Sequence, residues 1–240
     1  MTQDEAKRMA ARCALEFVED GMLLGLGSGT TSAIFIQELG ERVKQGLRVR
    51  GIATSIASQQ LAESLSIPIT NFDESPLLDL AIDGADEIGP GLALIKGGGG
   101  ALLREKIVES ASRKFIVIAD SSKLADQLGR FPLPVEVIKM ALPIVTRKLE
   151  AFGLNPKLRH HPDGSIYITD EGNYLLDCAC GTITNPAKTA AEIRGIAGVV
   201  EHGLFLGMAS LALIAGDKGV TKIGKLYGDR YRKAVSRLAS

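Results

Sequence analysis

The chain has 240 residues, 45% hydrophobic and 23% charged, a globular composition that suits one large domain or a large domain with a small companion. Its 28 basic and 28 acidic residues give zero net charge, which argues against a broad nucleic-acid surface or an anionic membrane as partner. The few aromatic residues and the absence of Trp argue against base-stacking platforms and sugar-stacking lectin sites.

The location of the protein is indicated by three further features. The first residues mix acids and bases without a continuous apolar core, so we expect no signal peptide. The longest apolar runs, such as residues 208–215, are too short to span a bilayer. The three cysteines make no disulfide framework, and Cys178 and Cys180 would share one face of a strand, which favours core packing over redox chemistry. These features predict a soluble cytoplasmic protein.

The first half of the chain alternates between helical and strand patterns. Such alternation predicts an α/β fold with a mostly parallel, Rossmann-like sheet and helices on both faces. Helices are expected at 3–18, 29–43, 55–65 and 101–112, and strands at 22–26, 48–53, 67–69, 77–82 and 115–119.

The pattern changes at the F-P-L-P sequence of residues 131–134. After it we expect the order strand, helix, strand, strand, helix, strand, which is the ferredoxin-like α+β pattern. These elements are predicted at 133–138, 143–152, 157–160, 173–179, 186–194 and 199–205. Residues 208–215 and 221–225 should return to the main sheet. We therefore predict a Rossmann-like catalytic domain of residues 1–130 and 206–240 and a small domain of residues 131–205. The basic tail, 227–240, is interpreted as a helix or a frayed end with no assigned role.

A glycine-rich loop at residues 25–31 lies between the first predicted strand and the next helix. This arrangement is typical of phosphate sites. The loop has Thr30 where a dinucleotide fingerprint needs its third glycine, and the next strand ends in Thr54 and Ser55 without the acid that holds a ribose. It also lacks the lysine of a Walker A loop. We therefore predict a site for one small phosphate and no nicotinamide cofactor.

Residues 82–106 carry the most concentrated polar pattern. Asp83 and Asp86 follow a buried strand, Lys96 precedes four glycines, and the next helix carries Glu105. Glycine N–H groups before a helix can point at an anion, and a lysine with carboxylates beside them indicates proton transfer on an anionic substrate. Spacing alone does not choose between Glu105 and Glu109, which are both expected toward the polar side of the helix.

Loops at 25–31, 54–55, 83–86 and 120–123 follow four predicted parallel strands. In such sheets the ligand lies at the carboxyl ends of the strands, so these loops should converge on one active site. The three histidines show no metal-ligand spacing, so no metal site is predicted.

Several motifs together resemble type A ribose-5-phosphate isomerase over about residues 3–225. They are D-G-A-D at 83–86, K-G-G-G at 96–99, L-R-E-K at 103–106, G-S-G-T-T at 27–31, F-P-L-P-V-E-V at 131–137 and G-V-V-E-H-G-L-F at 198–205. The resemblance implies interconversion of D-ribose 5-phosphate and D-ribulose 5-phosphate in the pentose phosphate pathway. It also implies no metal or organic cofactor, and a homodimer or homotetramer.

The resemblance further implies roles for individual residues. Glu105 would be the general base, Lys96 would lie near the reacting oxygens, and Asp83 and Asp86 would help to open the sugar ring. The remaining expected substrate-binding residues are Ser28, Gly29, Thr30, Thr31, Gly84, Ala85, Gly97, Gly98, Gly99 and, near the phosphate, Lys123 and Lys7. The loop reads G-S-G-T-T where many members have G-T-G-S-T, an exchange that keeps the hydroxyl groups.

Other functions are compatible with a related fold. A coenzyme A transferase and a sugar-phosphate deaminase are alternative enzymes, and release of ammonia would identify the deaminase. A sugar-phosphate sensor domain is the binding-only alternative. A sensor should lack the Glu105–Lys96 pair and usually carries a helix-turn-helix, for which we expect no room before Met22.

Overall fold

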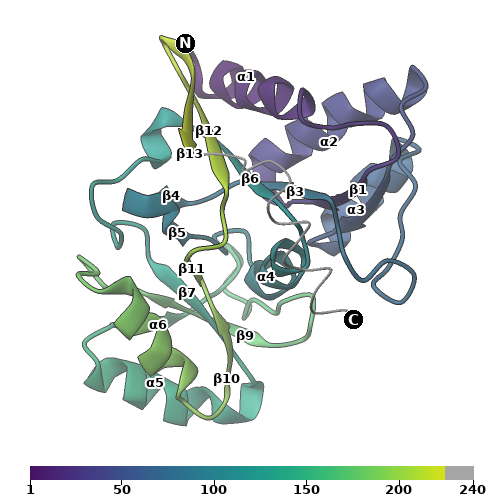
Figure 1. Ribbon diagram of the computed structural model, residues 1–240. Coiled ribbons are helices and arrows are strands. Elements are labelled where there is room, and N and C mark those ends of the chain that lie inside the picture. The colour runs from purple at the N-terminus through teal and green to yellow at the C-terminus, as the bar shows by residue number, and fades with distance from the viewer. Residues whose placement is uncertain (225–240) are drawn as a thin grey trace, which may run out of the picture.

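The computed structural model describes residues 1–224, so the predicted tail 227–240 and residue 225 of the last predicted strand lie outside the described part (Figure 1). Six α-helices are described within it: α1 (Gln3–Leu15), α2 (Gly29–Lys44), α3 (Ile56–Ser64), α4 (Leu102–Ser110), α5 (Leu142–Ala151) and α6 (Pro186–Arg194). The strands are β1 (Leu23–Leu26), β2 (Arg50–Ala53), β3 (Leu80–Asp83), β4 (Glu87–Ile88), β5 (Leu94–Ile95), β6 (Phe115–Asp120), β7 (Leu133–Val137), β8 (Pro156–Leu158), β9 (Tyr174–Cys178), β10 (Val199–His202), β11 (Leu204–Phe205), β12 (Leu211–Gly216) and β13 (Gly219–Gly224).

A six-stranded sheet with the order β13-β12-β6-β3-β1-β2 forms the upper part of the molecule in Figure 1. All neighbouring strands run parallel except the edge strand β13, which is antiparallel to β12. Alternate residues face opposite sides, so Leu80 and Ile82 pack in the core with α1 and α2 while Ala81 joins a second core under β4 and β5. The predicted α/β fold with a mostly parallel sheet is confirmed.

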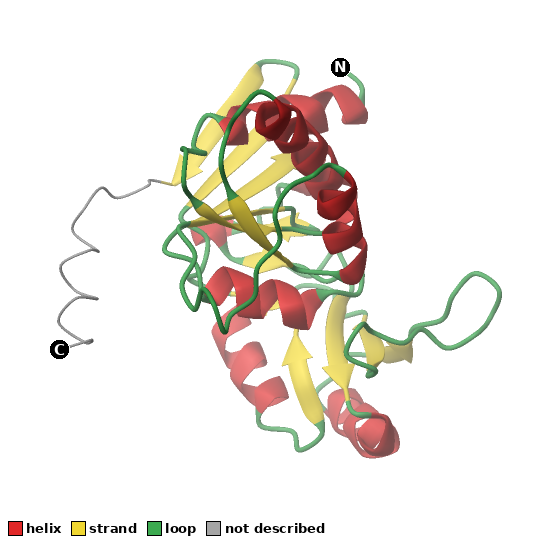
Figure 2. Cartoon of the chain, turned by 90° about the vertical axis from the view of Figure 1, so that its right-hand side faces the viewer, coloured by secondary structure: helices red, strands yellow, loops and turns green. Residues whose placement is uncertain are grey.

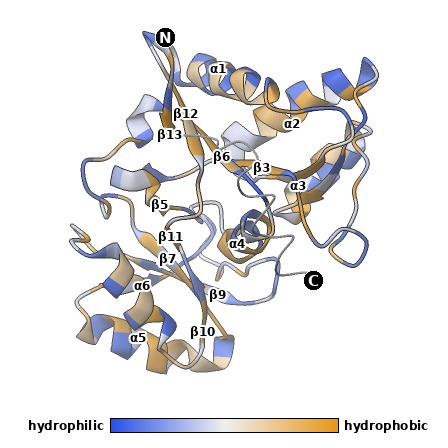
Figure 3. Cartoon of the chain, viewed as in Figure 1, coloured by the Kyte–Doolittle hydropathy of each residue, from blue (hydrophilic) through white to orange (hydrophobic). Residues whose placement is uncertain are grey.

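The helices begin and end where local signals place them. Thr2 and Glu5 form a reciprocal capping box at the start of α1, and four alanines of this helix are buried. On α2, Phe35, Ile36 and Leu39 are buried against the sheet. Figure 3 shows the same pattern, with hydrophobic residues along the central strands and hydrophilic ones on the outer sides of the helices. The predicted helix 3–18 is three residues too long, because helical structure stops at Leu15.

A four-stranded antiparallel sheet with the order β10-β7-β9-β8 lies below the main sheet, together with α5 and α6 (Figure 2). Its elements follow the predicted order along the chain, β7-α5-β8-β9-α6-β10, so the ferredoxin-like pattern is present. The Asn185 side chain caps α6, and Pro186 occupies the first turn.

Two predicted strands differ from the structure. Residues 199–205 are not one strand, because β10 belongs to the four-stranded sheet while β11 pairs with β5 in a small sheet of order β11-β5-β4. Gly203 separates them, and a Cβ there would lie 2.4 Å from the Lys96 carbonyl oxygen. The expected strand 67–69 is a single bridge between Ile69 and Gly51. No helix within residues 1–224 is long and apolar enough to cross a membrane.

Candidate active site

The loop between β1 and α2 lies directly against the end of β3. A Cβ on Gly27 would lie 2.1 Å from a carboxyl oxygen of Asp83, and Gly29 has a φ of 81°, so both positions favour glycine. The hydroxyl of Ser28 donates a hydrogen bond of 2.5 Å to Oε1 of Glu105 rather than capping its own helix. The loop therefore presents its hydroxyl to the predicted base.

Asp83 is the central acceptor of the site and is 1% exposed at the end of β3. Its Oδ1 accepts from the Ser28 N–H at 2.9 Å and from the Ser32 hydroxyl at 2.7 Å. Its Oδ2 accepts from Lys96 Nζ at 2.9 Å. This set of donors holds one side-chain rotamer and ties β3 to α2 and to the segment after β5.

Lys96 lies at the centre of a buried charge cluster. Its ammonium also donates to the Gly84 carbonyl at 2.7 Å and lies 3.6 Å from Glu105 and 3.1 Å from Glu109. Burial favours the neutral amine, but Asp83, Glu105 and Glu109 outweigh it and raise the pKa of Lys96 well above its ordinary value. Lys96 is therefore a permanent cation at neutral pH.

Glu105 and Glu109 do not lie on the polar side of α4, so that prediction is wrong. They are 4% and 3% exposed, because the two residues are one helical turn apart on the face that packs over Lys96. Burial, with the nearby Asp83 charge, raises the pKa of Glu105 to about 7, against the opposing effects of Lys96 and the Ser28 hydroxyl. Burial also raises the pKa of Glu109 well above its ordinary value.

Asp86 lies next to the glycine loop. Its Oδ2 accepts from the Gly98 N–H at 2.7 Å, and a Cβ on Gly98 would lie 2.6 Å from Oδ1. Burial raises the pKa of Asp86, while the Gly98 N–H and the charges of Lys96 and Lys123 oppose that rise. A glycine at 98 is thus required for the close contact between the D-G-A-D turn and the loop.

The start of α2 combines exposed N–H groups with a lysine. Gly29 and Thr30 are exposed, and Lys7 Nζ, from α1, donates to the Thr30 hydroxyl at 3.1 Å. Lys123 follows β6 on a short 3₁₀ turn and is half-buried. A helix N-terminus with a cation beside it is suited to a phosphate dianion.

The structure therefore brings most of the predicted residues together. Ser28, Asp83, Lys96 and Glu105 contact one another directly, and Asp86 joins them through the glycine loop. Within residues 1–224, Lys123 makes no hydrogen bond or ion pair with these four, and its positive charge lowers the pKa of Asp86 against the effect of burial. The other predicted positions line the same edge of the sheet: Thr31, Gly84, Ala85, Gly97 and Gly99.

A family model described as ribose 5-phosphate isomerase A (phosphoriboisomerase A) matches residues 50–219. A ribose-5-phosphate isomerase A of Nitrobacter hamburgensis is 51% identical over 226 residues, which cover 92% of this chain and 97% of the relative. The chain belongs to the ribose-5-phosphate isomerase A family. The resemblance found in the sequence motifs is thereby confirmed.

Solved structures agree with this assignment. The ribose 5-phosphate isomerase A of Methanocaldococcus jannaschii has a TM-score of 0.89 and 40% identity, covering 93% of this chain and all of that one. A D-ribose-5-phosphate isomerase in complex with phospho-erythronic acid has a TM-score of 0.91 and 39% identity, covering 94% of this chain and all of that one. The isomerase fold is therefore shared along nearly the whole chain.

Three residues that contact the predicted site residues, Ser32, Arg159 and Tyr167, were missed in the sequence analysis, and Glu109 was considered only as an alternative base. Ser32 lies one turn after Ser28 and binds Asp83, and Glu109 lies one turn after Glu105, so their spacing was an available signal. Arg159 donates to the carbonyls of Gly97 and Gly98, and the Tyr167 hydroxyl donates to that of Gly99. These two residues come from the four-stranded part of the chain, and no local pattern connects them to the loop.

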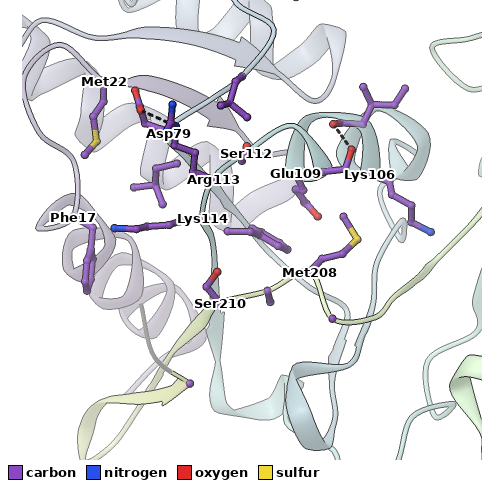
Figure 4. A pocket seen from close by; sticks show the side chains of 18 of the residues that line it. Phe17, Met22, Asp79, Lys106, Glu109, Ser112, Arg113, Lys114, Met208 and Ser210 are labelled. Carbon is purple, nitrogen blue, oxygen red and sulfur yellow. Dashed lines mark hydrogen bonds and ion pairs between the residues drawn. The ribbon is translucent and has the colours of Figure 1, made fainter. Parts of the chain in front are cut away.

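A cleft of about 1390 Å³ opens at the opposite end of the parallel strands, where Met22, Lys114 and Ser210 directly precede β1, β6 and β12 (Figure 4). Glu109 lines this cleft as well as contacting Lys96, so α4 separates the two regions. In parallel sheets the chemistry lies at the carboxyl ends of the strands, and the buried charge cluster is found there. The presence of a cleft alone therefore does not identify the active site of this isomerase.

Proposed function

We propose that the protein interconverts D-ribose 5-phosphate and D-ribulose 5-phosphate through an enediolate, in the non-oxidative pentose phosphate pathway. The observation that carries this proposal is the buried Glu105 carboxyl, which lies between the Ser28 hydroxyl and the Lys96 ammonium beside the start of α2. Aldose–ketose isomerisation needs a carboxylate base, a cation at the reacting oxygens and an anchor for the phosphate. All three lie at this edge of the sheet.

In the proposed reaction Asp83 and Asp86 assist opening of the sugar ring. Glu105 then removes the C2 proton of the open-chain aldose, and the C1 carbonyl takes the electron pair to give the enediolate. Lys96 stabilises the negative oxygen, which is the largest electrostatic requirement of the step. Glu105 returns the proton to C1 while the hydroxyl proton passes from O2 to O1, leaving the carbonyl at C2. No oxidant or other co-reactant is consumed.

The phosphate would bind at the N–H groups and hydroxyls of residues 28–31, with Lys7 and Lys123 as cations. Lys7 already contacts Thr30 at 3.1 Å, and Gly29 and Thr30 are exposed. A phosphate there would place the carbon chain toward Glu105, because Ser28 contacts that carboxyl directly. A related isomerase forms a complex with phospho-erythronic acid, a ligand that carries both a phosphate and a carboxylate.

Incubation with ribose 5-phosphate, with detection of the ketose, tests the proposed function directly. We expect the ketose to accumulate to an equilibrium with the aldose and no ammonia to be released from amino sugar phosphates. Release of ammonia would indicate the deaminase instead. Acyl exchange with coenzyme A would indicate the transferase, and tight binding of the sugar phosphate without turnover would indicate the sensor domain.

We also propose the organisation that the sequence predicted. Residues 1–130 and 206–224 would form the catalytic domain and 131–205 the small domain, with the four-stranded sheet lying wholly within the latter; residues 225–240 of the predicted catalytic domain lie outside the described part. We further propose a homodimer or homotetramer acting in the cytoplasm. The domain boundaries would be tested by limited proteolysis and the assembly by light scattering.

The activity should fall on the acidic side of neutrality. Because burial raises the pKa of Glu105 to about 7, the carboxyl is protonated below that pH and cannot accept the C2 proton. We expect kcat/KM to follow a single ionisation, with half its maximal value near pH 7 and a tenfold loss per pH unit below it. A rate profile that stays flat down to about pH 5 would contradict this description of the base.

Lys123→Ala should weaken substrate binding more than chemistry. Loss of a phosphate contact that is equal in the ground and transition states raises KM and leaves kcat nearly unchanged. One charge-assisted contact corresponds to about a tenfold rise in KM. The exposed Lys148→Ala, on α5, is the matched control and should match the parent. Equal effects of the two variants would remove Lys123 from the phosphate site.

Turnover should survive exhaustive chelation. Lys96 supplies the positive charge at the reacting oxygens, so the proposed mechanism gives a divalent ion no role. The rate of ketose formation, measured before and after dialysis against a chelator, should be the same. Loss of turnover that a divalent ion restores would contradict the mechanism.

A further inference from the structure

Three successive carbonyl groups of the glycine loop point at side chains from the four-stranded part of the chain. Arg159 Nη1 donates to the carbonyl of Gly97 at 3.2 Å and to that of Gly98 at 3.0 Å. The Tyr167 hydroxyl donates to the carbonyl of Gly99 at 3.2 Å, and its ring lies 5.6 Å from the guanidinium. Arg159 and Tyr167 thus bind the glycine loop on the side where its carbonyl oxygens lie.

Arg159 is itself fixed in place. Its Nε donates to Asp177 Oδ2 at 2.8 Å, and its Nη2 donates to Oδ1 of the same carboxylate. The arginine side chain is only 13% exposed. These two hydrogen bonds to one carboxylate leave Nη1 directed at the loop. The single ammonium of a lysine cannot contact Asp177 and the loop in this way.

The direction of these carbonyls determines where the loop N–H groups point. In a trans peptide the C=O and the following N–H point in opposite directions, so the N–H groups of Gly98 and Gly99 face away from Arg159. The Gly98 N–H reaches Asp86 at 2.7 Å, which shows that this direction is the active-site side. The Gly99 N–H donates to no protein group within residues 1–224, and the space at the Gly99 Cα is open.

We propose that Arg159, fixed by Asp177, is a positioning residue that aims and polarises the Gly99 N–H toward the oxygen of the sugar that becomes negative. This inference rests on the proposed isomerase function. A cation on the carbonyl side of a peptide strengthens its N–H as a donor, because hydrogen bonds in a chain polarise one another. Arg159 acts through the peptide and does not touch the substrate.

The test compares Arg159→Ala, Arg159→Lys and Asp177→Asn with Lys157→Ala. Lys157 is exposed on β8, two residues from Arg159, and serves as the matched control. Misaimed donors cost tenfold or more in rate, so we expect kcat to fall by about tenfold to 10²-fold in Arg159→Ala. The kcat of Arg159→Lys should also be lower than that of the parent. Asp177→Asn should show a smaller fall in kcat than Arg159→Ala, and Lys157→Ala should have the kcat of the parent. Added guanidinium ion should restore part of the rate of Arg159→Ala.

A binding measurement separates positioning from loss of the fold. Phospho-erythronic acid carries a carboxylate in addition to its phosphate, and under this proposal the Gly99 N–H would donate to that carboxylate, so Arg159→Ala should bind it about tenfold more weakly while its affinity for inorganic phosphate stays unchanged. Equal loss of both affinities, or a kcat of Arg159→Ala within twofold of Lys157→Ala, would overturn the proposal. Failure of the parent protein to form ketose would instead overturn the proposed function.

Discussion

Replacement of Glu105 by Gln should lower kcat by at least ~10²-fold, because general base catalysis typically contributes about 10²–10⁴-fold. The amide keeps the size and the contact with the Ser28 hydroxyl but cannot accept the C2 proton. Substrate binding should survive, since the proposed phosphate contacts lie on other residues. Steady-state kinetics of ketose formation and calorimetry with phospho-erythronic acid would measure the two effects separately.

The control for this variant is Glu150→Gln, an exposed residue on α5 that should behave as the parent. Glu109 is unsuitable as a neutral control, because its carboxyl is buried 3.1 Å from Lys96 Nζ. If Glu105→Gln and Glu109→Gln both kept near-parent rates, the base would have to be Asp83 or Asp86, and the site would be redrawn around the D-G-A-D turn.

Replacement of Lys96 by Met should impair both chemistry and stability. The ammonium lies against Asp83, Glu105 and Glu109, so its loss leaves buried carboxylates without their cation. Breaking a buried ion pair by removing one partner costs about 3–5 kcal/mol in the free energy of unfolding. Loss of the cation at the enediolate should lower kcat by about 10²–10³-fold in the folded protein.

The pH dependence of the stability of Lys96→Met shows whether the lost cation causes the destabilisation. Burial already raises the pKa of Glu105 and of Glu109 above their unfolded values while Lys96 opposes that rise, so loss of the cation should further raise the pKa of both carboxyl groups. Their protonation then stabilises the folded protein at low pH, and this stability is lost as the pH rises through the folded pKa. Denaturant unfolding should therefore show Lys96→Met closest to the parent near pH 5 and furthest from it near pH 8. If the loss in free energy of unfolding did not change with pH, the result would contradict the role of Lys96 as the cation of the buried carboxyl groups.

The fold was predictable because its signals are local. Buried strands such as β3 and β6 are short apolar runs, and the glycine loop before α2 marks a strand-to-helix junction. The split between β10 and β11 was not predicted, because residues 199–205 were interpreted as one continuous strand. Gly203 separates them because the Lys96 backbone passes close to it, a contact between residues more than one hundred positions apart.

The site was predictable to the extent that parallel strands bring their carboxyl ends together. Ser28, Asp83 and Lys96 were expected there and contact one another. The burial of Glu109 was missed, because a charged residue one turn from another reads as part of a solvated face. Arg159 was missed because its link to the glycine loop depends on how the four-stranded sheet packs against the main one.

The central claim is that Glu105 carries a proton between C2 and C1. Nuclear magnetic resonance of ribose 5-phosphate incubated in deuterium oxide tests it most directly, because a carboxyl that holds the transferred proton exchanges it with solvent. The parent is expected to introduce deuterium at C2 of the aldose and C1 of the ketose, and Glu105→Gln is expected to introduce hardly any. Exchange at the parent rate in Glu105→Gln would show that another group moves the proton.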